Sequence, residues 1–321
     1  MKTLILVFVA LIMSNFIAQS QSCEELLIAV QNNNYNQVKS LLKTVDPNCY
    51  HDGLTQPRTP IGMAASMGNL EIGKLLVTNK ARATYRFKSD ASALMIASQN
   101  GHFEFAKFLT EKGAKVNRKI DRDGTALMSA VKGGNKDIVA LLLKLGANPN
   151  AEVLGDGNAI MLAGKQDNIE ILKLLLSHSG DVNKGTVRDG TALISASARG
   201  NLAMVQALVK LGASVNKLSD RDGNPLIMAA KNGHLDVVQF LVDSGANVNV
   251  YVQGDETPLI GAAWNGHLEV VKFLIEKGAD INKTVRDRYS LVSEKRNALR
   301  MAKRGEHTGV VSYLKSKGAK E

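Results

Sequence analysis

The sequence is poor in cysteine, proline and aromatic residues. Its 321 residues include two cysteines, six prolines and one tryptophan, and aromatic residues make up 5%. It contains no His-Glu-x-x-His and no Cys-x-x-Cys, so two common signatures of metal or redox sites are missing. No aromatic platform on which nucleic-acid bases could stack can be recognised. We therefore expect a protein that is not an enzyme, with no cofactor, no metal and no nucleic-acid partner.

Long apolar runs are also missing, apart from one near the N-terminus. Lys2 precedes the apolar stretch 4–13, and the stretch 14–22, which reads SNFIAQSQS, follows it. A charged start, a stretch too short to span a bilayer comfortably and small residues for cleavage are typical of a secretory signal peptide. We expect residues 1–22 to be a signal peptide, cleaved after Ser20 or Ser22. The mature protein would then be periplasmic or secreted, without a membrane span.

What the chain does contain is a repeated module, clearest in residues 257–282. Thr257 is placed to cap a short helix that Pro258 opens, and an alanine pair keeps that helix slim. An Asn-Gly-His turn precedes a second helix, 268–275, with an apolar face. Gly278 is placed to end this helix in the left-handed conformation. A module this small cannot bury its own apolar face, so copies should lie beside it.

The copies occur at a fixed period. Asp-Gly pairs end at residues 124, 157, 190 and 223, and successive differences between these numbers are all 33. Most copies close with Gly-Ala and then an asparagine, as at Gly245, Ala246 and Asn249. Together with the Thr-Pro-Leu-like start and the Gly-His turn, this pattern resembles the ankyrin repeat. The resemblance covers nearly everything after residue 23.

The resemblance implies an all-α fold, an ankyrin-repeat solenoid of about nine helix-turn-helix repeats with β-hairpin-like finger loops. The repeat domain would span residues 23–321, with an N-terminal cap at about 23–50 and a C-terminal cap at about 287–321. Glycine and threonine are adjacent at Gly124-Thr125, where the family usually has a residue between them. This departure leaves the conformation of the finger tips open.

Histidines recur at the turn of several repeats, for example His102, His234 and His267. Ligands of one metal ion must converge within a few ångströms, whereas equivalent residues of successive repeats lie one layer apart. The resemblance implies that these histidines form hydrogen bonds at the turn.

The two cysteines, Cys23 and Cys49, flank the first expected helix pair. Two antiparallel helices bring the start of one near the end of the other, and export favours disulfides. A disulfide would staple the N-terminal repeat. The alternatives are two unpaired thiols, or a lipid on Cys23, although residues 20–22 lack the usual approach to a lipid site.

Function in repeat arrays usually lies in the variable surface positions. In this family these are the finger tips and the two residues after the alanine pair, which face a concave groove. The resemblance implies that the residues contacting a partner are Lys132, Lys165, Arg199, Lys231, Asn232, Trp264 and Asn265 in the groove, and Arg118, Arg122, Arg188 and Arg221 at the fingers.

Trp264 is the sharpest single candidate, because it is the only tryptophan and occupies a position where other repeats carry Gln, Lys or Ala. An exposed tryptophan beside a groove is a typical hot spot of a protein interface. The alternative is that it packs on a neighbouring finger.

The formal net charge of +10 follows the groove and the fingers in part. This favours a partner with an acidic surface. The alternative is ordinary solubility, since Lys74, Lys107, Lys173 and Lys272 fall on helices away from the groove. We expect a monomeric, exported scaffold that binds another protein. An accessory or regulatory subunit of an exported enzyme, and a secreted host-directed effector, are the alternative functions.

Overall fold

The computed structural model describes residues 21–51, 59–84, 91–120, 123–153, 157–186, 190–219, 223–252, 256–286 and 295–321. The predicted signal peptide lies outside these ranges except for its last two residues. The chain divides into two compact units, residues 1–156 (unit 1) and 157–321 (unit 2). The sequence predicts one repeat domain from residue 23 onward, and the division falls inside it.

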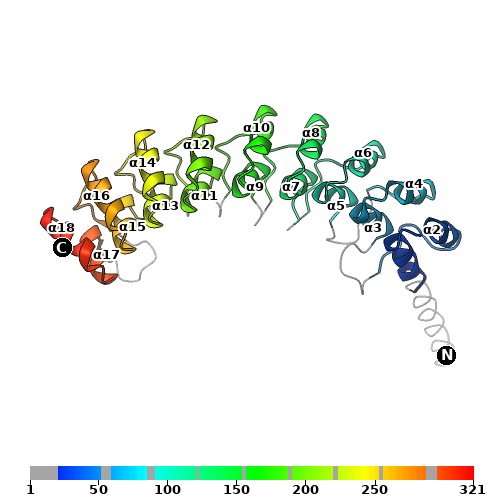
Figure 1. Ribbon diagram of the computed structural model, residues 1–321, viewed down its shortest axis with the longest axis horizontal. Helices are drawn as coiled ribbons and strands as arrows, with labels where there is room; N and C mark the ends of the chain where they lie inside the picture. Colours follow the sequence, from blue (N-terminus) through cyan, green and yellow to red (C-terminus); the bar gives the residue numbers. More distant parts are fainter. Residues whose placement is uncertain are drawn as a thin grey trace, which may run out of the picture. The chain divides into compact units, whose positions relative to one another are not determined.

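Unit 1 is built from helix pairs (Figure 1). Within its described residues, helix 21–31 pairs with α2 (Tyr35–Leu41), α3 (Pro60–Met67) with α4 (Leu70–Thr78), α5 (Ala93–Gln99) with α6 (Phe103–Glu111), and α7 (Ala126–Lys132) with α8 (Lys136–Lys144). First helices pack on first helices, as α3 does on α5 and α5 on α7, and second helices pack on second helices.

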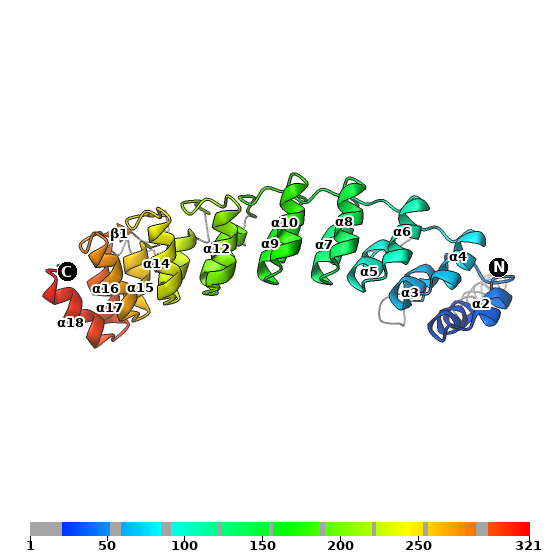
Figure 2. The same cartoon turned by 45° about the horizontal axis from the view of Figure 1, so that its top comes forward.

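Unit 2 repeats this arrangement. Its described pairs are α9 (Ala159–Lys165) with α10 (Ile169–Ser177), α11 (Ala192–Ala198) with α12 (Leu202–Lys210), α13 (Pro225–Lys231) with α14 (Leu235–Asp243), α15 (Pro258–Trp264) with α16 (Leu268–Glu276), and α17 (Ala298–Arg304) with α18 (Thr308–Ser316). Figure 2 shows the two helices of each pair side by side, for example α9 and α10. Four described pairs in unit 1 and five in unit 2 agree with the predicted nine repeats.

Each first helix from α3 onward begins at a buried capping side chain. In α15 the hydroxyl of Thr257 accepts a hydrogen bond from the backbone N–H of Ile260 at 3.2 Å, and Pro258 stands at the first helical position. The same bond is made by Thr59, Ser92, Thr125, Asn158, Thr191, Asn224 and Asn297. Such a cap contributes about 1 kcal/mol, so the predicted helix starts are fixed by these side chains.

Each second helix contributes an apolar ridge to the core. Leu175, Leu208, Leu241 and Leu274 occupy equivalent positions in unit 2 and are fully buried. The helix ends where Gly278 adopts a φ of +90°, a conformation that a residue without Cβ reaches at no steric cost. Asparagines then connect successive repeats. Asn216 donates to the carbonyl of Gly245 at 3.0 Å and accepts from the N–H of Asn247 at 2.9 Å.

At the base of several finger loops, the two sides of the loop pair as a short antiparallel turn. Single β-bridges join Ile120 to Gly124, Thr186 to Gly190 and Ser219 to Gly223. The last finger is a hairpin of β1 (Val285–Arg286) and β2 (Lys295–Arg296), in which Val285 faces Arg296 in the register. Arg296 also pairs with the buried carboxylate of Glu256 at 3.0 Å, which ties this hairpin to the start of α15. The finger tips, whose conformation the sequence leaves open, lie outside the described residues.

The repeat from 158 to 183, here called repeat five, departs from the others at both of its turns. Asp167 has a φ of +57° and Ser179 a φ of +64°, at positions where neighbouring repeats carry glycine. A residue with a side chain is strained in this region. Asn33, Lys80 and Glu306 are also non-glycine residues with positive φ, but each is at one turn of its repeat, whereas repeat five has such a residue at both turns.

No helix within the described ranges is both long and apolar enough to cross a membrane.

Candidate functional site

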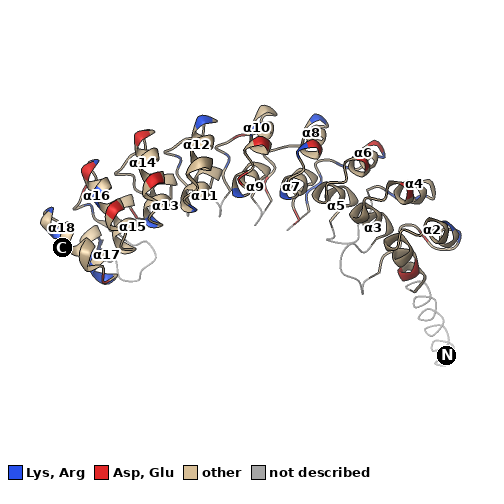
Figure 3. Ribbon diagram, viewed as in Figure 1, with Lys and Arg blue, Asp and Glu red and all other residues tan. Residues whose placement is uncertain are grey.

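The first helices of unit 2 lie side by side and end in a row of long side chains. α9 packs on α11, α11 on α13, α13 on α15 and α15 on α17. In Figure 3 basic residues mark the ends of α9, α13 and α17. We call the residues at or just after these helix ends the helix-end row: Lys165, Arg199, Lys231, Trp264 and Arg304. Four of the five are cations, so the row is a basic surface that includes one aromatic ring.

Lys231 is one of the exposed cations of this row. It is exposed, and no ion pair joins its ammonium group to another residue in the described part of the chain. Its backbone is fixed, because its carbonyl accepts a hydrogen bond from His267 Nε2–H at 3.1 Å. The next residue, Asn232, is also exposed and donates to the carbonyl of Met228 at 2.9 Å. A fixed backbone with an available ammonium group is suited to binding a carboxylate.

Trp264 is half-buried, so the predicted exposed ring is only partly exposed. The guanidinium carbon of Arg304 lies 5.6 Å from the centre of the indole, within the range of a cation–π contact. The carbonyl of Trp264 accepts from His307 Nε2–H at 2.9 Å. The neighbouring Asn265 is exposed and donates to the carbonyl of Gly261 at 3.0 Å. The ring is thus held in place by the last repeat and keeps one accessible part.

Arg304 was not among the residues predicted to contact a partner. The signal was present in the sequence, because aligning residues 297–307 with 257–267 places Arg304 at the position of Trp264. The charged insertion 289–296 before the last repeat hides this equivalence, because it breaks the fixed spacing of the earlier repeats.

Arg199 has a structural role that the sequence did not reveal. Its guanidinium donates to the carbonyls of Lys165 at 2.6 Å and Gly164 at 2.8 Å, and it pairs with Asp167 at 3.3 Å. These carbonyls end α9, where the helix dipole favours a cation. Arg199 therefore anchors the turn of repeat five from the neighbouring repeat.

The other lysines predicted for the groove differ in exposure. Lys165 is exposed at the end of α9, whereas Lys132, at the end of α7 in unit 1, is half-buried. Two lysines on second helices of unit 2 form ion pairs. Lys173 binds Glu170 at 3.0 Å and Lys272 binds Glu269 at 2.8 Å. The hydrogen bond to Glu269 raises the pKa of Lys272.

Of the predicted finger arginines, only Arg118 falls in the described ranges. Its Nη1 donates to the carbonyl of Thr84 at 3.1 Å, across to the preceding repeat. The others, Arg122, Arg188 and Arg221, lie outside the described residues. Arg118 therefore links its finger to the preceding repeat.

The turn histidines form the hydrogen bonds that the resemblance implies. His102 Nε2–H donates to the carbonyl of Ser66 at 3.0 Å, and His234 Nε2–H to that of Ala198 at 3.1 Å. Each bond reaches the end of the preceding first helix, as the bonds of His267 and His307 also do. Within the described residues, no group of three or more His, Cys, Asp or Glu is arranged to hold a metal ion.

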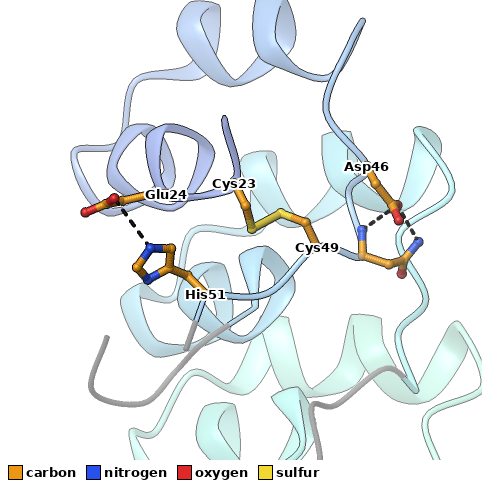
Figure 4. The surroundings of a disulfide bond; sticks show 6 residues. Cys23, Glu24, Asp46, Cys49 and His51 are labelled. Atoms are coloured by element: carbon orange, nitrogen blue, oxygen red, sulfur yellow. Dashed lines mark hydrogen bonds and ion pairs between the residues drawn. A yellow bond between two sulfur atoms is a disulfide. The ribbon is translucent and has the colours of Figure 1, made fainter. Parts of the chain in front are cut away.

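The N-terminal repeat is closed by a disulfide between Cys23 and Cys49, whose Cα atoms are 5.9 Å apart (Figure 4). Cys23 is buried. Beside the disulfide, Glu24 pairs with His51 at 3.4 Å, and Asp46 accepts from the N–H of Asn48 at 2.9 Å. The disulfide and the Glu24–His51 pair fasten the chain after α2 to the start of helix 21–31.

Two family models match the chain. A model of ankyrin repeats in three copies matches residues 26–120, 127–219 and 211–287, and a model of ankyrin repeats in many copies matches residues 262–314. With the helix pairs, caps and turn histidines described above, these matches show that the chain belongs to the ankyrin repeat family. No curated protein matches the chain. Ankyrin repeats generally mediate protein–protein interaction and are typically non-catalytic.

Proposed function

We propose that this chain is an exported, non-catalytic scaffold that binds one acidic protein through the helix-end row, with Lys231 and Trp264 at the centre of the contact. The observation that carries the proposal is their position on neighbouring first helices, α13 and α15, which pack directly on each other. Lys231 offers an ammonium group, and Trp264 offers an aromatic surface beside it. Aromatic anchors with charged neighbours are common at the centre of protein interfaces.

The cations of the row favour a partner with carboxylates. Packed helices are about 8–10 Å apart, so Lys231 and Arg304, which lie two helices apart with Trp264 between them, would meet different groups of the partner. Lys165, Asn232 and Asn265 would add polar contacts at the rim. Arg199, whose guanidinium holds the end of α9, would position the row.

Export is supported by the charged start and short apolar stretch of residues 1–22 and by the pairing of Cys23 with Cys49. The mass of the mature chain tests both the cleavage of the signal peptide and the formation of the disulfide. Cleavage before Cys23 and a mass about two hydrogens below that of the reduced chain are expected. A chain that retains residues 1–22, or that has two free thiols in its native compartment, would contradict the proposal of export.

Site-specific photo-crosslinking tests the binding surface. A photoreactive residue is placed at position 231 or 264 and, as a control, at Lys74, which is exposed on α4 in unit 1. The crosslinked protein is identified and purified, and its affinity for variants is measured. Trp264→Ala with Lys231→Glu should weaken binding about a hundredfold or more, since each hot-spot side chain contributes about 1–2 kcal/mol or more. The control, Lys74→Glu alone, changes the net charge by the same amount and should leave the affinity unchanged; a loss in the control equal to that of the double variant would refute the site.

A further inference from the structure

The segment that joins α16 to β1 contains a motif that occurs nowhere else in the sequence. Residues 280–284 read DINKT, so Asn282 is followed by Lys283 and then by Thr284. Asn-x-Ser/Thr, with a middle residue other than proline, is the acceptor signal for N-linked glycosylation of exported proteins. No other asparagine of the 321 residues has serine or threonine two positions after it. The sequence therefore contains a single acceptor of this kind.

The structure places this segment on the surface. Asn282, Lys283 and Thr284 are all exposed and lie outside any helix or strand, and burial resumes at Val285, the first residue of β1. The Oγ1 of Thr284 donates to the carbonyl of Asn282 at 3.3 Å, so the hydroxyl of the signal lies beside its asparagine. Exposed loop residues of this kind are accessible to an enzyme that modifies the chain.

The amide nitrogen of Asn282 is not used by the repeat framework. At equivalent positions of earlier repeats, the Nδ2 atoms of Asn183, Asn216 and Asn249 donate to a glycine carbonyl of the next repeat at 3.2, 3.0 and 3.0 Å. The Oδ1 of Asn282 accepts from the N–H of Lys320 at 2.8 Å, whereas its Nδ2 makes no hydrogen bond to any residue that the structure describes. An N-linked sugar replaces one hydrogen of this Nδ2, so the bond from Lys320 to Oδ1 can remain.

We propose that Asn282 carries an N-linked glycan in the mature protein, an inference that rests on the export proposed above. In the transfer, the Nδ2 of Asn282 attacks the anomeric carbon of a sugar in a glycosyl diphosphate donor. The new C–N bond replaces the C–O bond to the diphosphate, which leaves with the electron pair of that bond. The proton lost from Nδ2 passes to a base of the transferring enzyme, and no oxidant or reductant is needed.

The glycan is attached at the end of the repeat opposite to Trp264. α15 ends at Trp264 and α16 begins at Leu268, so Trp264 lies beside the turn between these two helices. α16 packs against α15 and runs back from this turn, and Asn282 follows its far end. At 1.5 Å per residue, α16 separates the two positions by roughly 13 Å along its axis. Modification of Asn282 is therefore compatible with binding through the helix-end row.

Peptide mapping by mass spectrometry of the mature protein from its native source tests the site. Residues 278–283 form one tryptic peptide, which contains Asn282 and excludes Thr284, so a sugar on the threonine would be found on a different peptide. The mass of peptide 278–283 should exceed that of its sequence by the mass of a glycan, and its fragmentation should release sugar ions. Tryptic peptide 211–217, which contains the equivalent Asn216 without the signal, is the internal control and should have its unmodified mass.

The same digest separates this inference from the proposal of export. A mature chain that lacks residues 1–22 but has peptide 278–283 at its unmodified mass would overturn the glycan and leave export standing. A chain that retains residues 1–22 would overturn export, and with it this site.

Variants expressed in the same source test whether the signal itself is read. Thr284→Ala removes the hydroxyl but keeps Asn282 and its bond to Lys320, so this variant should keep the circular dichroism of the wild type and lose the glycan. Thr284→Ser keeps the hydroxyl and should keep the glycan. Lys283→Arg is the matched control, because it retains both the signal and the tryptic site, and it should also be glycosylated. A mass increase that persists on peptide 278–283 in Thr284→Ala would overturn the proposal.

Discussion

Repeat five, residues 158–183, and the repeat from 257 to 282, here called repeat eight, have the same fold but are held together differently. Repeat eight has glycine at both turns, and His267 bonds it to the preceding repeat. Repeat five has Asp167 and Ser179 at the two glycine positions. The end of its first helix is held by Arg199, which donates two hydrogen bonds from the following repeat.

The difference shows that an irregular surface residue is not by itself a sign of binding. Arg199 and Trp264 are both unusual for their positions, and the sequence placed both in the same groove. Arg199 proves to fasten the turn of repeat five, whereas Trp264 keeps an accessible part and Lys231 remains exposed. We therefore propose for binding those side chains that stay accessible and do not hold the end of a helix in place.

The largest effect on stability is expected from substitutions in the apolar core, where the two repeats are built alike. Leu175 in repeat five and Leu274 in repeat eight occupy equivalent, fully buried positions. Replacing either by alanine should destabilise the chain by about 2–5 kcal/mol, from lost burial and the cavity left behind. Urea unfolding followed by circular dichroism measures this loss. If Leu274→Ala alone were destabilising, repeat five would not be packed as described.

A smaller effect is expected at the two kinds of turn. Arg199→Ala and His267→Ala each remove side-chain hydrogen bonds to the end of a first helix. We expect each to cost about 1 kcal/mol, because both sites are partly solvated. Arg199→Lys should not restore stability, since one ammonium group cannot reproduce the fork that binds two carbonyls. Lys231→Ala serves as the control and should leave the urea midpoint unchanged; full rescue by lysine would contradict this role of Arg199.

The smallest effects are expected from exchanging the residues at the ends of α10 and α16. Ser179→Gly should stabilise repeat five by about 0.5–1 kcal/mol, because glycine adopts a positive φ without strain. Gly278→Ser should destabilise repeat eight by a similar amount. A Cβ at Gly278 would meet nothing within 4 Å, so this change tests backbone strain without a clash. Thermal unfolding of both variants checks the opposite signs; shifts in the same direction would rule out strain as the cause.

The repetitive part of the structure was predictable from the sequence. Thr257 as a cap, Gly278 as a helix end and the turn histidines have the predicted roles, because each depends on contacts that recur every repeat. The role of Arg199 was not predictable, because its partners lie in another repeat at a turn where the pattern itself fails. Such properties arise between repeats and have no signal within one repeat.

The most direct test of the account is photo-crosslinking from position 264 in the native compartment, compared with position 231 and with Lys74 on α4. The account predicts that one protein is crosslinked from positions 264 and 231, and that the yield from position 74 is at background. It also predicts that the Arg199→Ala variant, once shown to be folded, still crosslinks this protein from position 264. Equal yields from positions 264 and 74, or different proteins captured from 264 and 231, would contradict a binding surface centred on Trp264 and Lys231.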